Sequence, residues 1–183
     1  MEELFATFVF FFAVIDPFGS VPVFLAVTQG FSAQQKKATA LHAVLFSGGI
    51  LLFFIILGEI LLTAIGISLA AFQIAGGIVL FVFALTMIFG EGKPESEIKS
   101  FVNTTQTAIF PMAIPSIASP GAMLAVVLLT KNDVYSLYEQ FISSLLMLLV
   151  LLIVYILLAA ASSIHKFIGS AGESIISRIM GLI

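Results

Sequence analysis

The chain has 183 residues, of which 61% are hydrophobic and only 9% are charged, and its formal net charge is −3. A soluble domain carries about 25% charged residues because water must hydrate its surface, so this composition excludes a soluble fold and predicts a protein solvated by lipid. The sequence has no basic run, which argues against nucleic acid as a partner, and no cysteine, which excludes thiolate metal sites and cysteine nucleophiles.

Six apolar segments follow one another along the chain. A bilayer core of about 30 Å needs about 20 apolar residues in a helix. The segments are residues 4–27, 38–65, 67–89, 108–130, 141–161 and 174–183.

The acidic start at Glu2 and Glu3 is unlike a cleavable signal peptide. The sixth segment is still apolar at its last residue, which predicts that the encoded protein continues. We therefore predict an all-α, multi-pass protein of the plasma membrane, with the lipid bilayer as its main partner.

The polar stretch at residues 90–107 divides the chain into two halves of three segments each, residues 1–89 and 108–183. Basic residues favour the cytoplasmic side of a membrane. With the N-terminus outside, the outer loops hold one basic residue, Lys131, and all the others fall on the inner side: Lys36, Lys37, Lys93, Lys99, Lys166 and Arg178. This orientation makes the polar stretch a cytoplasmic linker.

Prolines mark the first and fourth segments as broken helices, because a proline inside a helix removes a hydrogen bond and clashes with the preceding turn. Five of the six prolines lie there: Pro17, Pro22, Pro111, Pro115 and Pro120. The pairs Asp16-Pro17 and Ser119-Pro120 lie 103 residues apart, and each is a typical helix start, with a capping residue before the first helical proline. Each pair also falls near the middle of its segment. The breaks should therefore meet near the bilayer midplane and face a common polar cavity.

The two halves also share other features, which indicates an internal repeat. Gly66 and Gly169 lie 103 residues apart, each before the third segment of its half. Because three crossings return the chain on the opposite side, the second copy must be inverted relative to the first. Broken helices at matching places in inverted repeats are typical of the substrate sites of secondary transporters. The pairs Gly48-Gly49 and Gly76-Gly77 are expected to allow close contacts between helices.

The runs around the two breaks resemble the signature stretches of the MarC family. They read Asp-Pro-Phe-Gly-Ser-Val-Pro-Val-Phe from residue 16 and Ala-Ile-Pro-Ser-Ile-Ala-Ser-Pro-Gly-Ala from residue 113. The resemblance covers nearly the whole chain and implies transport of small neutral amino acids such as glycine and alanine. Two positions depart from the family pattern. Ser20 stands where an asparagine is expected and Ser119 where a glycine is expected, which implies a modified pocket.

Eight residues are the candidates for substrate binding, all at the breaks: Asp16, Pro17, Gly19, Ser20, Ser116, Ser119, Pro120 and Gly121. Asp16 is the only acid well inside a segment, which favours a functional role, although capping alone is the alternative. Glu59, near the outer end of the second segment, is expected to reach the membrane interface. We predict no cofactor and no metal site, but a coupling ion, either H⁺ or Na⁺.

Three other functions compete with amino acid transport. An intramembrane aspartyl protease would need a second acid at the midplane, but the only other aspartate, Asp133, falls in a predicted outer loop. We therefore predict that the chain is not an enzyme. A channel, or a structural subunit that needs a partner, is the main alternative, and export of another small metabolite is a further one. A homo-oligomer remains open at this stage.

Overall fold

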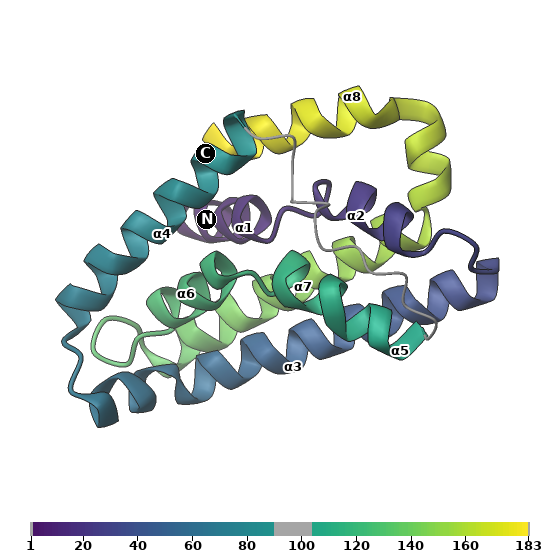
Figure 1. The fold of residues 1–183 in the computed structure, drawn as a ribbon. Coiled ribbons are helices and arrows are strands. Elements are labelled where there is room, and N and C mark those ends of the chain that lie inside the picture. The colour runs from purple at the N-terminus through teal and green to yellow at the C-terminus, as the bar shows by residue number, and fades with distance from the viewer. Residues whose placement is uncertain (1, 90–103, 183) are drawn as a thin grey trace.

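The computed structural model describes residues 2–89 and 104–182, and every element within these two ranges is a helix (Figure 1). Most of the predicted linker, residues 90–103, lies outside the described residues. The first half contains α1 (Glu2–Ile15), α2 (Ser20–Val27), α3 (Ala33–Ile65) and α4 (Leu69–Phe89). The second half contains five elements: α5 (Thr104–Thr107), the π-helix η2 (Ala108–Ile117), α6 (Pro120–Leu129), α7 (Leu137–Ala159) and α8 (Ala161–Leu182).

Three helical segments in the described ranges are long and apolar enough to cross a membrane: Glu2–Val27, Ala33–Ile65 and Leu137–Ala159. A fourth candidate is the pair Thr104–Ile117 and Pro120–Leu129, which is bent by 60° at the second break. A shorter apolar stretch, Ala70–Thr86, lies within α4. The chain is therefore an all-helical membrane protein with three or four candidate spans, and the arrangement of six spans as an inverted repeat stays a prediction.

Capping residues set the starts of α3 and α7, and both helices begin earlier than predicted. Ser32 caps α3 by accepting a hydrogen bond from the Gln35 backbone N–H at 3.3 Å, while the Ser32 N–H donates to Gln35 Oε1 at 2.8 Å. Ser136 and Glu139 form the same reciprocal pair at the start of α7. Such capping boxes satisfy N–H groups that a helix start leaves without partners, so polar residues outside the apolar runs still join the helix.

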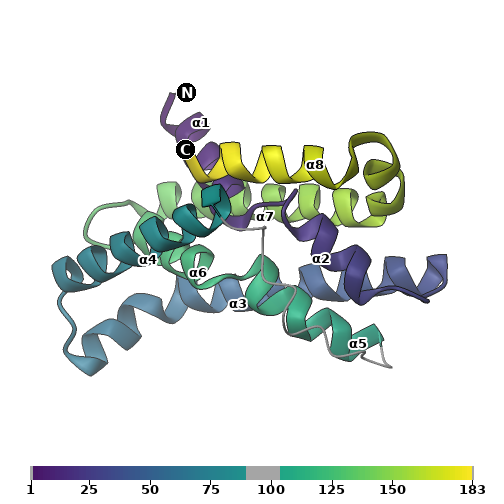
Figure 2. The same cartoon turned by 45° about the horizontal axis from the view of Figure 1, so that its top comes forward.

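The prediction for the sixth segment is wrong in its boundary. Residues 174–183 do not form a separate helix after a loop, because α8 already begins at Ala161 and runs to Leu182. Gly169, with φ 68° and ψ 169°, bends this helix near its middle. Counting apolar residues misses such a helix because its first part mixes apolar and polar side chains. In Figures 1 and 2, α8 turns back after the bend and ends beside the end of α4, which it contacts.

The two long helices α3 and α7 pack together, and the broken segments lie against them. Gly48 permits this approach, since a methyl group added there would lie 3.4 Å from Leu151 Cδ1. Gly76 likewise faces Leu124 of α6, as expected, whereas Gly49 and Gly77 face open space. The largest fully buried side chains come from both halves: Phe11, Phe24, Ile15, Leu51, Met112, Ile117, Met147 and Leu158.

Several contacts between elements have counterparts when the two halves are matched, although those of α1 with α8, of α6 with α7 and of α7 with α8 have none of comparable extent. If α1, α2, α3 and α4 are matched to η2, α6, α7 and α8, the contact of α3 with η2 corresponds to that of α7 with α1. Three further contacts have counterparts in the same way. The contact of α2 with η2 corresponds to that of α6 with α1, and the contact of α3 with α6 corresponds to that of α7 with α2. The contact of α4 with α6 corresponds to that of α8 with α2. These matched contacts are compatible with the repeat predicted from the prolines, which stays a prediction.

Candidate substrate site at two helix breaks

The first break is a turn over residues 16–19 that Asp16 closes. Asp16 has a positive φ of 49°, and its Oδ1 accepts a hydrogen bond from the Gly19 N–H at 2.9 Å. The Ser20 N–H and the Ser20 hydroxyl both donate to the Asp16 carbonyl, each at 3.2 Å. Asp16 therefore closes the turn at the break, but it does not cap the next helix as the sequence predicts, because the N-cap position of α2 is Gly19.

The prediction that Pro17 is the first residue of the new helix is wrong, because α2 begins three residues later, at Ser20. Asp16 adopts the left-handed region that aspartate tolerates better than most residues. The chain therefore makes a turn through Pro17, Phe18 and Gly19 before it regains regular helix. Both Pro17 and Gly19 are buried within this turn.

The second break follows the predicted pattern. Ser119 is extended, with φ −69° and ψ 159°, and its Oγ accepts a hydrogen bond from the Ala122 N–H at 3.1 Å. Pro120 is the first residue of α6, where its missing N–H costs nothing because that group would have no helical partner.

An irregular segment that the sequence did not predict leads into the second break. In η2 the backbone leaves helical geometry at Phe110 and again at Ile114. Each of these residues precedes a proline, Pro111 or Pro115, whose ring disfavours helical geometry in the residue before it. Two prolines four residues apart were the signal that could have predicted this distortion.

The structure brings the two breaks together. The Ser116 hydroxyl donates to the Ser20 hydroxyl oxygen at 3.3 Å, joining residues 96 positions apart in the chain. The polar candidates at the breaks are buried, since Asp16 is 1%, Ser20 0%, Ser116 4% and Ser119 2% exposed. Among the eight candidates, Pro120 is the exception, because its side chain is exposed. The meeting of the breaks was expected, while the role of these residues in binding a substrate stays a prediction.

Gly121 marks a close approach that the sequence did not predict. A methyl group added there would lie 3.3 Å from Val14 Cγ1, 3.1 Å from Leu80 Cδ2 and 3.7 Å from Ser119 Oγ. The start of α6 is thus fitted between α1 and α4. Leu80 belongs to the surroundings of the site although its apolar side chain gave no signal in the sequence.

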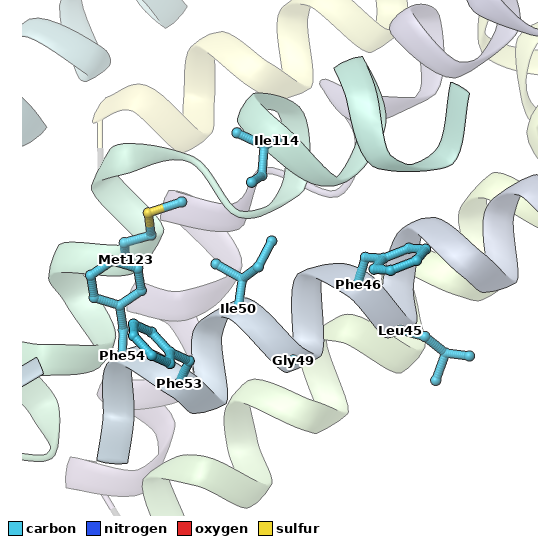
Figure 3. Close-up of a pocket in the computed structure, with 8 residues that line it drawn as sticks. All are labelled: Leu45, Phe46, Gly49, Ile50, Phe53, Phe54, Ile114 and Met123. Atoms are coloured by element: carbon cyan, nitrogen blue, oxygen red, sulfur yellow. The ribbon is translucent and has the colours of Figure 1, made fainter. Parts of the chain in front are cut away.

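A pocket of about 600 Å³ lies between α3 and the second broken segment (Figure 3). Ile114 and Met123, from either side of the break, face the α3 residues that form the rest of its lining: Leu45, Phe46, Gly49, Ile50, Phe53 and Phe54. Its lining contains none of the eight candidate residues and no polar side chain. It is therefore not the polar cavity that the sequence predicts.

The two halves also agree in local geometry at the ends of their helices. At each break a side-chain oxygen accepts the N–H three residues later, at positions 103 residues apart. Thr28 and Thr130 end α2 and α6, and each donates its hydroxyl to the carbonyl four residues earlier at 2.6 Å. Gly66 and Gly169 both have positive φ values, 76° and 68°.

Sequence comparison agrees with these features. The family model for MarC family integral membrane proteins matches residues 1–183. The chain belongs to the MarC family. A UPF0056 membrane protein of Methanocaldococcus jannaschii is 34% identical over 175 residues, which cover 94% of this chain and 85% of that protein. A UPF0056 membrane protein of Aquifex aeolicus is 32% identical, and the match covers 100% of this chain and 89% of that protein. The UPF0056 membrane protein YvbG of Bacillus subtilis is 28% identical, and the match covers 96% of this chain and 85% of that protein. No solved structure matches the chain.

This membership establishes the broad class. The MarC family model describes integral membrane proteins, and the relatives named above are membrane proteins by their names, which state no substrate. The chain is therefore an integral, multi-pass protein of a lipid bilayer.

Proposed function

We propose that this MarC family chain is a secondary transporter of small neutral amino acids, or of similar small zwitterions, with the substrate bound between the two helix breaks. The hydrogen bond between Ser116 and Ser20 carries this proposal, because it joins the two breaks inside the protein. Non-helical backbone at membrane depth is tolerated where it is buried in protein or lines a cavity, and broken helices that meet are typical of transporter sites.

The chemistry of the breaks suits a zwitterion. A helix start presents backbone N–H groups and the positive end of the helix dipole, both of which favour a carboxylate. Such starts lie at Ser20 and at Pro120. The substrate's ammonium group needs acceptors, which the Asp16 carboxylate and the carbonyl groups at the end of η2 would supply. The buried side chains of Val14, Val21 and Ile117 crowd this region, which favours a substrate with a small side chain.

The agreement between the halves supports an inverted repeat of six spans, and the placement of the basic residues supports an N-terminus on the outside. In such transporters the two repeats rock against each other and expose the site to each side in turn. Matched contacts between the halves are what this mechanism requires, because each contact on one side needs an equivalent on the other.

A channel is the second candidate, and the buried polar side chains distinguish it from a transporter. A channel needs a polar path along several helices. Many of the buried hydroxyls away from the breaks instead donate to a carbonyl of their own helix, as Thr28, Thr39, Ser47 and Thr130 do. The buried carboxylate and the serines that bond across elements gather at the breaks, which favours a central site.

The decisive experiment tests uptake of labelled glycine, alanine and leucine by proteoliposomes under imposed H⁺ and Na⁺ gradients. We expect the wild type to accumulate the two small amino acids and to discriminate against leucine. Asp16→Asn should keep the hydrogen bond from the Gly19 N–H but abolish accumulation driven by a proton gradient, because the amide cannot take up a proton. Accumulation driven only by Na⁺, and unchanged in the variant, would assign the coupling to Na⁺ held by backbone carbonyls.

The matched control is Asp133→Asn, which removes the other aspartate, in the loop after α6. It should leave uptake unchanged. If the folded wild type takes up no amino acid under any gradient, the proposed function is wrong. Ion conductance without accumulation would favour the channel instead.

A further inference from the structure

A polar connection holds the far end of α6 to α3. Glu59 of α3 accepts two hydrogen bonds through Oε2, from the Asn132 backbone N–H at 3.0 Å and from Asn132 Nδ2 at 2.6 Å. Gln140 of α7 donates to Asn132 Oδ1 at 3.1 Å, so three elements meet at this asparagine. From its place in the sequence, Glu59 is expected only to reach the membrane interface. The structure instead gives its carboxylate a partner 73 residues away.

The packing beside this connection is unusually close. Gly58 precedes Glu59, and a methyl group added there would lie 2.5 Å from Val127 Cγ2 of α6. Asn132 lies two residues beyond Thr130, which ends α6. Helix α6 therefore has the break at Ser119 at one end and the Glu59 connection at the other, about 15 Å apart along a ten-residue helix. Release of the connection would leave the far end of α6 held to α3 by packing alone, as at Gly58 and Val127.

The corresponding place in the other half lacks this connection. The residues 103 positions from Asn132 and Glu59 are Gln29, just after α2, and Ser162, at the start of α8. Both are exposed, as Asn132 is, but no hydrogen bond joins their side chains in the described part of the chain. The halves thus correspond closely at the breaks but differ at the far ends of α2 and α6. Between these corresponding positions of the described residues, a charged side chain makes the connection only at Glu59.

We infer that Glu59 and Asn132 form a gate on the side of the membrane where α3 ends, which is the outer side in the predicted orientation. This inference rests on the proposed transport function. The gate holds α6 against α3 and closes the path from that side to the break at Ser119. Glu59 acts as a positioning residue, since its carboxylate touches Asn132 and not the substrate. Opening of the gate exposes the site to that side during each transport cycle.

The test uses the absence of cysteine in the sequence, which lets a single introduced thiol report access to the site. Ser119→Cys places the thiol at the second break, and a membrane-impermeant thiol reagent is applied to right-side-out or to inverted vesicles. Adding Glu59→Ala should raise the labelling rate from the Glu59 side about tenfold, because hydrogen bonds to a charged group are among the stronger ones. Adding Asn132→Asp should raise it at least as much, since two carboxylates then face each other. Labelling from the opposite side should not rise.

Asp133→Asn is the matched control, because it alters the neighbouring acid of the same loop, which pairs with Lys131 and not with Glu59. It should leave the labelling rate unchanged. Equal increases from both sides, with a loss of folded protein, would show a merely structural role and overturn the gate. An unchanged rate in Glu59→Ala would overturn it as well.

A cross-link separates the gate from the transport function. In Glu59→Cys/Asn132→Cys, a short bifunctional thiol reagent should lower amino acid uptake below that of the same double variant without reagent, whereas a monofunctional thiol reagent should not. Uptake that continues after cross-linking at the rate of the untreated double variant would contradict the gate. If the wild type transports nothing but labelling still depends on Glu59 from one side only, the proposed function fails and the gate stands.

Discussion

The two helix breaks perform the same structural task with different chemistry. At the first break the Asp16 carboxylate closes a turn of three residues, and the new helix begins only after that turn, at Ser20. At the second break a hydroxyl caps the chain, and the new helix begins at once with Pro120. The first break follows a regular α-helix, while the second follows a π-helix that is distorted at Phe110 and Ile114.

This difference indicates a division of roles. The first break holds the only buried carboxylate of the described residues, so it is the part of the site that can carry charge. The second break is neutral but closely packed against α1, α3 and α4 through Gly121 and the helix that follows. We therefore expect changes at the second break to act through packing, and changes at the first break to act through Asp16.

The largest effect on stability should come from filling the close contacts of α6. Gly76→Ala would place a methyl group 2.4 Å from Leu124 Cδ2, and relief of this overlap should lower the free energy of unfolding by about 1–3 kcal/mol. Gly77→Ala is the control, because that position faces open space and alanine favours a helix. Thermal unfolding in detergent measures both variants. Equal midpoints would show that α6 is not held tightly.

Loss of the side-chain acceptor should destabilise the protein more at the first break than at the second. Asp16→Ala should lower the free energy of unfolding by about 2 kcal/mol and Ser119→Ala by about 1 kcal/mol, because a charged acceptor forms the stronger hydrogen bond. Each variant leaves one N–H without its side-chain acceptor, that of Gly19 or that of Ala122. Chemical unfolding in mixed micelles measures the difference. A larger loss for Ser119→Ala would reverse the roles assigned to the breaks.

The smallest effect should be the coupling between the breaks. Ser20→Ala and Ser116→Ala each remove the hydrogen bond that joins them, so the double variant should lose less stability than the sum of the single variants. We expect a coupling energy of about 0.6 kcal/mol, the usual value for hydrogen bonds between membrane helices. Strict additivity in the double-mutant cycle would mean that the two hydroxyls do not act together.

The sequence by itself determined the membrane class, the places of both breaks and the capping role of Ser119. Composition set the class, because a chain with 9% charged residues cannot cover itself with a hydrated surface. The breaks and the cap at Ser119 were predictable since capping and proline effects act within a few residues. The start of α8 was not predictable from apolar length, because its first part is helical despite its polar side chains.

Only the tertiary structure decided which side chains meet. Nothing local relates Ser20 to Ser116, Glu59 to Asn132, or Gly121 to Leu80, because these contacts depend on how the helices pack. An apolar residue such as Leu80 has the same appearance in a sequence whether it faces lipid or a helix break. Capping and helix breaking are local effects, since they depend on residues that are close in the sequence. The surroundings of a buried site arise from close packing between distant segments, which only the folded chain reveals.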